Sequence, residues 1–175
     1  MTVNRLYEIA ITSNIDLILD TNIRLKPWKQ AERARNTLSK FLKVKMILTN
    51  MENLSILVLG LNTIDAAKKI LNKGAEIVIV KLGNEGAFAV DREGKAYRSS
   101  AFIVPFVEDV IGADDAFDAA FLASIYRGLS IDEALTYANA AGALVVTVRG
   151  DMEAQPSWKE LEIFLESQRR AVMIR

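Results

Sequence analysis

Two adjacent aspartates at the start of a helical pattern are the most informative candidates for chemistry in this sequence. The segment at residues 107–117 reads VEDVIGADDAF, in which a turn of small residues leads from a β-like run directly into a helix. A helix N-terminus presents unpaired N–H donors and the positive end of the helix dipole, which suits a phosphate group. An aspartate in the first turn, Asp114 or Asp115, would lie beside that phosphate and accept a hydroxyl proton. The alternative is that both carboxylates merely complement the helix dipole.

The composition excludes several other kinds of chemistry. The 175 residues contain no cysteine and no histidine, so disulfides, His–Cys zinc sites, Ser-His-Asp triads and a histidine general base are ruled out within the chain. Acid–base chemistry must therefore use carboxylates, lysine or tyrosine. The 22 Lys and Arg residues balance the 22 Asp and Glu residues, so no net field favours nucleic acid or an acidic membrane.

Features missing from the sequence also suggest where the protein is located and what it binds. No positive-then-apolar leader opens it, and no apolar run approaches the roughly 18 residues of a membrane span. We therefore expect a cytoplasmic protein that acts on small molecules, with no nucleic-acid or membrane partner.

Short β-rich runs alternate with longer helical patterns, which is typical of an α/β fold with a mostly parallel sheet. Strands are expected at residues 15–20, 45–49 and 76–81, helices at 28–42, 63–72 and 113–127, and a hairpin at 87–98. Ser130 with Glu133, and Ser157 with Glu160, form capping boxes that predict two more helix starts. Without repeats or linkers, one compact domain over residues 1–175 is the simplest interpretation.

The segment at residues 107–117 resembles the signature of the ribokinase-like (PfkB-type) carbohydrate kinases, Asp-Thr-Thr-Gly-Ala-Gly-Asp-Ala-Phe. It matches at Asp109, Gly112, Ala113, Asp115, Ala116 and Phe117. The resemblance implies a three-layer α/β/α fold in which the amides of Gly112, Ala113 and Asp114 form an anion hole for the transferred phosphoryl group. It implies that Asp115 is the general base that activates a sugar hydroxyl, and that positioning and charge stabilisation dominate catalysis.

Further matches follow in the family's order and imply a site for ATP and Mg²⁺. They assign nucleotide binding to Asn50, Lys81, Gly83, Gly86 and Asn139. On the residues alone, the two glycines are more often a plain turn, and the small residues around Asn139 are equally explained by close helix packing. The closing segment VRGD at residues 148–151 also matches. By the same resemblance, backbone near Asp109, Ile111 and Gly150 would hold a monovalent cation such as K⁺.

The segment at residues 20–28, DTNIRLKPW, resembles the Asp-Pro-Asn-x-Arg-x-x-x-Trp motif of 2-keto-3-deoxygluconate kinases. The resemblance implies that Arg24 helps to hold a sugar-acid carboxylate, a task suited to a forked guanidinium. On the residues alone, an arginine at a strand end that pairs with Asp20 or with solvent is the favoured alternative.

Three departures from the family pattern bear on activity. The resemblance covers only the C-terminal, nucleotide-side half of the family's fold, so we expect the lid and much of the sugar pocket to be missing. In the motif Asn-x-x-Glu, which helps to organise magnesium, Asn53 stands in place of the glutamate, and Glu52 lies one residue early, about 100° around a helix.

The third departure is Asp114, which replaces the second glycine of the anion-hole turn. We expect backbone strain of about 1–2 kcal/mol if that position needs glycine angles. A carboxylate about 4 Å from a phosphate would add repulsion of about 4 kcal/mol per charge pair at an effective dielectric near 20.

Two functions remain open on this evidence. The first is a phosphotransferase that moves the γ-phosphate of ATP to 2-keto-3-deoxygluconate, completed by a second chain or a dimer mate. The second is a catalytically impaired homologue that persists as an oligomeric or nucleotide-binding α/β module. A homo-oligomer is expected in both cases, because an exposed sheet edge and apolar face are usually buried in an interface. No Gly-x-Gly-x-x-Gly or Gly-Lys-Ser/Thr motif supports an unrelated nucleotide-binding fold.

Overall fold

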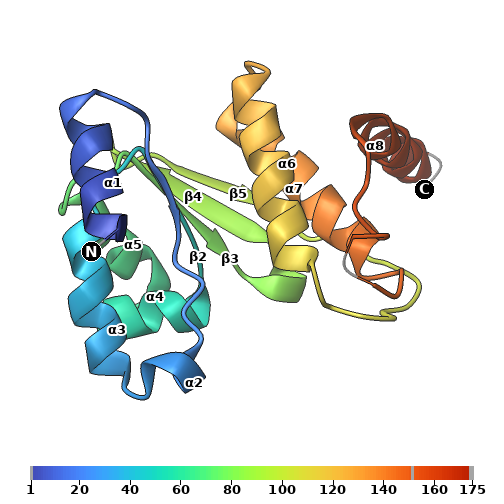
Figure 1. Ribbon diagram of the computed structural model, residues 1–175. Coiled ribbons are helices and arrows are strands. Elements are labelled where there is room, and N and C mark those ends of the chain that lie inside the picture. The colour runs from blue at the N-terminus through green and yellow to red at the C-terminus, as the bar shows by residue number, and fades with distance from the viewer. Residues whose placement is uncertain (1, 151, 174–175) are drawn as a thin grey trace. The chain divides into compact units, whose positions relative to one another are not determined.

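A computed structural model describes residues 2–150 and 152–173 of the chain (Figure 1). The described residues divide into two compact units, one formed by residues 2–82 and 88–96 and the other by residues 83–87, 97–150 and 152–173. The single domain expected from the sequence therefore stays a prediction. None of the helices among the described residues is long and apolar enough to cross a lipid bilayer.

The first unit is built from parallel strands with helical connections. Its elements in chain order are α1 (Thr2–Thr12), β1 (Ile18–Asp20), α2 (Leu25–Trp28), α3 (Ala31–Leu38), η1 (Ser39–Phe41), β2 (Met46–Asn50), α4 (Met51–Leu57), α5 (Thr63–Leu71) and β3 (Ile77–Lys81). β1 pairs with β2, and β2 with β3, in parallel. Two further strands, β4 (Ala87–Asp91) and β5 (Ala96–Ser99), complete a sheet of order β1-β2-β3-β4-β5. The predicted mostly parallel α/β sheet is confirmed.

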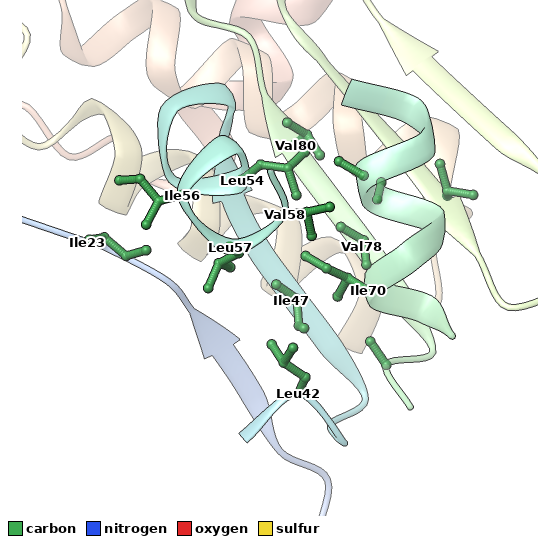
Figure 2. Packing of buried hydrophobic residues seen from close by; sticks show 14 of the residues in the cluster. Ile23, Leu42, Ile47, Leu54, Ile56, Leu57, Val58, Ile70, Val78 and Val80 are labelled. Atoms are coloured by element: carbon green, nitrogen blue, oxygen red, sulfur yellow. The ribbon is translucent and has the colours of Figure 1, made fainter. Parts of the chain in front are cut away.

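The core of the first unit explains why β2 and β3 are almost wholly apolar. Ile47 of β2 and Val78 and Val80 of β3 pack with α4 and α5 on one face of the sheet (Figure 2). Met46, Leu48 and Ile79 alternate with them and are also buried. Strands buried on both faces need continuous apolar runs, which is the pattern of parallel sheets. Polar side chains are therefore confined to the strand ends.

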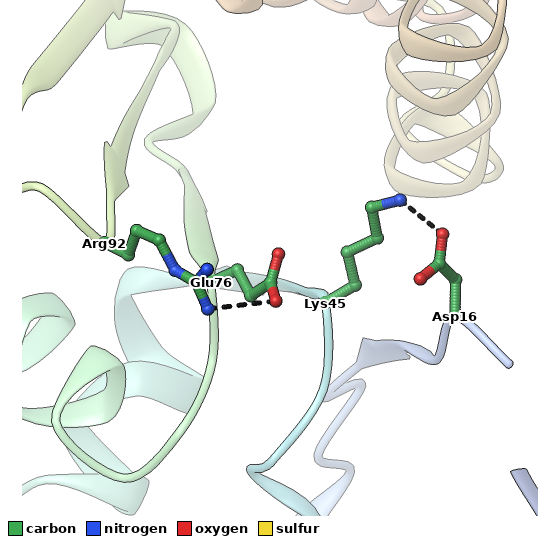
Figure 3. A network of polar contacts seen from close by, with 4 residues as sticks. All are labelled: Asp16, Lys45, Glu76 and Arg92. Carbon is green, nitrogen blue, oxygen red and sulfur yellow. Dashed lines mark hydrogen bonds and ion pairs between the residues drawn. The ribbon is translucent and has the colours of Figure 1, made fainter. Parts of the chain in front are cut away.

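Charged side chains gather at the amino ends of these strands. Lys45, just before β2, pairs with Asp16 before β1, and Arg92 after β4 pairs with Glu76 before β3 at 3.0 Å (Figure 3). All four side chains are substantially exposed, so these pairs add little stability. The amino edge of the sheet is therefore a solvated boundary, and the carboxyl edge is the candidate for ligand binding.

The structure corrects two expectations about the first unit. The predicted helix at 28–42 is broken, because Lys29 adopts a left-handed φ of 63° and its N–H closes α2 on the Leu25 oxygen at 2.8 Å. A separate helix, α3, then begins at Ala31. The helix α1 has no counterpart among the predicted elements; it contacts the rest of the unit through Tyr7, whose ring meets Phe41 edge-on and whose hydroxyl donates to the Lys43 oxygen.

The second unit is helical and rich in alanine. It contains η2 (Gly83–Glu85), α6 (Ala113–Tyr126), α7 (Ile131–Val145) and α8 (Trp158–Met173). Small side chains let α6 and α7 pack closely, and Leu161 and Leu165 of α8 join the same cluster. The predicted helix starts at 113 and after Ser130 and Ser157 are confirmed.

Both predicted capping boxes are present in the second unit. The Ser130 hydroxyl and N–H donate to the Glu133 carboxylate at 2.7 and 2.9 Å, and Ser157 does the same to Glu160 at 2.7 Å for both bonds. These hydrogen bonds, the side-chain bond first, hold the pKa of Glu133 and of Glu160 below the ordinary value for a glutamate. The serines thereby fix where α7 and α8 begin.

The core of the first unit makes a testable prediction in α5. Ile70→Ala removes a side chain that is 0% exposed, so we expect the free energy of unfolding to fall by about 2–5 kcal/mol. Ile64→Ala, in the same helix but 49% exposed, should change it by less than about 0.5 kcal/mol. Urea unfolding followed by circular dichroism measures both, and equal effects of the two variants would contradict the described packing.

Candidate active site

The turn before α6 has the backbone geometry of an anion-binding helix start. Gly112 is the N-cap residue with φ 79° and ψ −9°, a left-handed conformation that glycine adopts without strain. The first regular helical bond runs from the Ala116 N–H to the Gly112 oxygen at 2.9 Å. The N–H groups of residues 113–115 therefore precede the regular helical ladder, although that of Ala113 makes a long 3.4 Å bond to the Val110 oxygen. Such N–H groups and the helix dipole favour an anion.

Asp114 and Asp115 both lie in the first turn of α6 and are exposed. Asp114 is not among the described non-glycine residues with positive φ, which are Asn14, Asn22 and Lys29. The prediction of backbone strain at Asp114 is therefore wrong, because the left-handed residue of this turn is Gly112 and residue 114 is already helical. The repulsion between the charge of Asp114 and a phosphate stays a prediction.

The loop that leads into this turn is held by backbone bonds within the second unit. The N–H of Glu108 donates to the Val146 oxygen at 2.8 Å, after the end of α7. The Asp109 carboxylate accepts from the Ile111 N–H at 3.0 Å. Gln155 donates to the Gly112 oxygen at 3.4 Å. The turn before α6 is thus attached at both sides to the C-terminal end of α7 and the loop that follows it.

The monovalent-cation assignment to Asp109, Ile111 and Gly150 stays a prediction. Gly150 has φ 121°, and a Cβ there would lie 2.7 Å from a carboxylate oxygen of Glu153. The last residue of the matched segment, Asp151, lies outside the described residues. Within residues 2–150 and 152–173 no group of three or more His, Cys, Asp or Glu side chains is placed to hold a metal ion.

Two of the expected nucleotide-binding residues, Gly86 and Asn139, converge on one short segment of the second unit. The Asn139 side chain on α7 donates to the Ser99 oxygen at 3.0 Å and to the Ser100 oxygen at 3.3 Å. Gly86, at φ 95°, lies so close to the same segment that a Cβ would overlap the Ser99 oxygen and approach the Ala101 nitrogen to 2.6 Å. These residues position the backbone of residues 99–101, a contact that their sequence pattern did not reveal. Gly83, by contrast, has open space around its Cα.

In the first unit, Asn50 and Lys81 lie opposite each other at the carboxyl ends of β2 and β3, where they are register partners. The Asn50 carbonyl side-chain oxygen accepts from the Asn53 N–H at 2.9 Å and so caps α4. Lys81 is buried. In open α/β sheets, ligands bind outside the carboxyl ends of the strands, which is where both residues lie.

Arg24 follows the end of β1 at the same edge of the sheet. Its side chain is exposed, and its Nε donates to the Asn22 side-chain oxygen at 3.3 Å. Asn22 itself has a positive φ of 29°. Arg24, Asn50 and Lys81 thus belong to the first unit, whereas Gly112–Asp115, Gly83, Gly86 and Asn139 belong to the second.

Comparison with known proteins identifies the family. The family model described as pfkB family carbohydrate kinase matches residues 2–158. The chain therefore belongs to the pfkB family of carbohydrate kinases. The predicted ribokinase-like fold is confirmed by an E. coli protein assigned as a ribokinase II, in complex with ATP and Mg²⁺. It superposes with a TM-score of 0.85 and 29% identity over 94% of this chain and 53% of its own.

Two sugar-acid kinases are among the similar proteins of known name. The 2-dehydro-3-deoxygluconokinase of Thermoproteus tenax is 36% identical over 150 residues, which are 85% of this chain and 46% of that protein. A 5-dehydro-2-deoxygluconokinase of Halalkalibacterium halodurans is 31% identical over 102 residues, 58% of this chain and 30% of that protein. The chain thus spans at most about half the length of these relatives.

The close approach at Gly86 leads to a second prediction. Gly86→Ala and Gly83→Ala both place a Cβ on a residue with positive φ, at a cost of about 1–2 kcal/mol each. Only Gly86→Ala also forces the Cβ against backbone, so it should lower the free energy of unfolding by about 1–3 kcal/mol more. Thermal and urea unfolding of the two variants check this, and equal destabilisation would refute the described contact with residues 99–101.

Proposed function

We propose that this chain supplies the nucleotide-side half of a kinase that transfers the γ-phosphate of ATP to a hydroxyl of 2-keto-3-deoxygluconate. The observation that carries the proposal is the start of α6. Left-handed Gly112 turns the backbone so that a 14-residue helix opens with exposed Asp115 in its first turn. Membership of the pfkB carbohydrate kinases supports this assignment.

In the proposed mechanism, Asp115 accepts the proton of the sugar hydroxyl as its oxygen attacks the γ-phosphorus. The bond from that phosphorus to the β–γ bridging oxygen breaks, and ADP leaves with that oxygen. The N–H groups of Gly112, Ala113 and Asp114 stabilise the charge on the transferred phosphoryl group. Asn50, Lys81, Gly83, Gly86 and Asn139 are proposed to contribute to the nucleotide site, in part by positioning backbone.

The choice of a sugar acid rests on Arg24 and on the relatives. An exposed guanidinium at the carboxyl edge of a parallel sheet is suited to bidentate binding of a carboxylate. The T. tenax relative is named for 2-dehydro-3-deoxygluconate, another name for the same compound. Because the H. halodurans relative is named for 5-dehydro-2-deoxygluconate, both compounds belong in the assay.

Mg²⁺ is proposed to enter with the nucleotide. Mg²⁺ usually retains water and binds through one or two carboxylates together with substrate phosphates, so it does not need a cage of protein ligands. K⁺ near Asp109, Ile111 and Gly150 remains a further proposal.

Three observations favour the alternative function of an impaired, oligomeric or nucleotide-binding module. A second carboxylate, Asp114, lies in the proposed anion-hole turn. In addition, Glu52 is exposed on α4 and Asn53 is buried, so Glu52 does not replace the family's glutamate. An apolar hollow of about 510 Å³ beside β1, an edge strand of the described sheet, is a surface that an oligomer could bury.

Asp115→Asn tests the kinase proposal. Removing the general base while preserving shape should lower kcat by about 10²- to 10⁴-fold. The measurement is coupled ADP release by the full chain with Mg²⁺, ATP and each of the two sugar acids, beside circular dichroism to establish folding. A folded wild-type chain with no turnover on either compound would reject the kinase proposal and favour the alternative module. Calorimetry would then measure whether that module binds ATP.

Asp114 allows a second test of the same site. Asp114→Gly and Asp114→Asn both remove the charge, and only the first also changes the backbone freedom. Because Asp114 is already helical, we expect both to raise kcat/KM for ATP by at least about fivefold, as about 1 kcal/mol of repulsion at 4 Å in water implies. Steady-state kinetics at low and high salt measure this, with a smaller gain at high salt. A gain limited to Asp114→Gly would mean that backbone geometry, and not charge, limits the site.

A further inference from the structure

The chain leaves the sheet abruptly after β1. The strand ends at Asp20, whereas its neighbour β2 continues to Asn50. Thr21 still contacts β2, since its N–H donates to the Leu48 oxygen at 3.0 Å and its hydroxyl donates to that of Thr49 at 2.9 Å. Beyond Thr21 the strand ladder gives way to side-chain contacts, and the residues that follow include the proposed carboxylate-binding Arg24.

Asn53 supplies the contact that holds this continuation. With its amide oriented so that both groups are satisfied, the side-chain nitrogen donates to the Ile23 oxygen at 3.2 Å and the side-chain oxygen accepts from the Ile23 N–H at 3.1 Å. The amide thus makes the two hydrogen bonds to Ile23 that a neighbouring strand would otherwise make. Asn53 is only 5% exposed, so these two bonds are shielded from water. Losing them would leave buried polar groups without hydrogen-bond partners, which destabilises the fold.

We propose that Asn53 is a positioning residue that fixes the backbone at Ile23 and thereby sets the direction of Arg24. Ile23 is buried among the residues of α4 (Figure 2), while Arg24, the next residue, is exposed. Adjacent residues in extended backbone point to opposite sides, and the N-cap angles of Arg24, φ −104° and ψ 104°, are extended. Securing Ile23 inward therefore directs Arg24 outward.

The need for this contact explains why an amide, and not a carboxylate, occupies position 53. An asparagine side chain both donates and accepts, which matches one carbonyl and one N–H. An ionised carboxylate only accepts, so it would leave the Ile23 oxygen without its donor and place two oxygens face to face. Asn53 is on this argument a functional substitution, and Asn50, which caps the same helix, holds α4 in place beneath it.

The substrate part of this inference rests on the proposed function, so its test has two separate readouts. The first is amide hydrogen exchange at Ile23 in the ¹⁵N-labelled full chain, compared with Ile79 in the buried strand β3. The second is the KM and kcat for the sugar acid in the ADP-release assay. The variants are Asn53→Ala, Asn53→Asp, Arg24→Ala and the double variant Asn53→Ala with Arg24→Ala. The matched control is Asn36→Ala on the exposed face of α3.

We expect exchange at Ile23 to accelerate at least tenfold in Asn53→Ala and Asn53→Asp, with exchange at Ile79 unchanged. KM for the sugar acid should rise about tenfold or more with kcat nearly unchanged, and the double variant should bind no worse than Arg24→Ala alone. Unchanged exchange at Ile23 would show that Asn53 does not hold this backbone. Faster exchange with an unchanged KM, or additive losses in the double variant, would show that Asn53 does not act through Arg24.

If the wild-type chain does not turn over, calorimetric binding of the sugar acid replaces KM in the same comparison. Loss of binding in Asn53→Ala and Arg24→Ala, and not in Asn36→Ala, would support the inference even though the kinase proposal failed. Absence of wild-type binding would overturn the substrate role of Asn53 together with that of Arg24.

Discussion

The backbone groups at the ends of regular elements are the constraint on which the rest of this structure depends. Along β2 and β3 the residues paired by the parallel ladder are mostly buried, so most of their side chains are apolar. Where the ladder stops, N–H and C=O groups must find other partners. Four polar residues of the first unit lie at these points: Thr21 after β1, Thr49 and Asn50 at the end of β2, and Lys81 at the end of β3.

The second unit meets the same constraint with a helix. The N–H groups at the start of α6 have no partners within the helix, and the left-handed Gly112 turns the chain so that these groups and Asp115 share one turn. Elsewhere in this unit, Ser130 and Ser157 satisfy the corresponding groups at α7 and α8. The helix starts therefore differ: serine side chains cap α7 and α8, whereas α6 starts without a side-chain cap bond.

The two substitutions that depart from the family pattern have different physical consequences. Asp114 causes no backbone strain, since its position is helical, so the proposed effect on a phosphate rests on its charge. Asn53 stands where the resemblance places a glutamate, and its amide, in the orientation that satisfies its nitrogen and oxygen, bonds both backbone groups of Ile23. One substitution therefore bears on the proposed phosphate site, and the other on the segment that carries Arg24.

Much of this protein was determined by the sequence itself. Apolar runs specified β2 and β3, the serine–glutamate pairs specified the starts of α7 and α8, and the glycine-containing turn specified the start of α6, because each depends on neighbours within a few residues. The tertiary structure alone decided which strand ends lie opposite each other, such as Asn50 and Lys81, and which backbone a distant side chain holds. The contacts of Asn53 with Ile23, and of Asn139 with residues 99–100, join segments 30 and about 40 positions apart. Local propensity carries no information about such pairings, since they exist only once the core has brought the segments together.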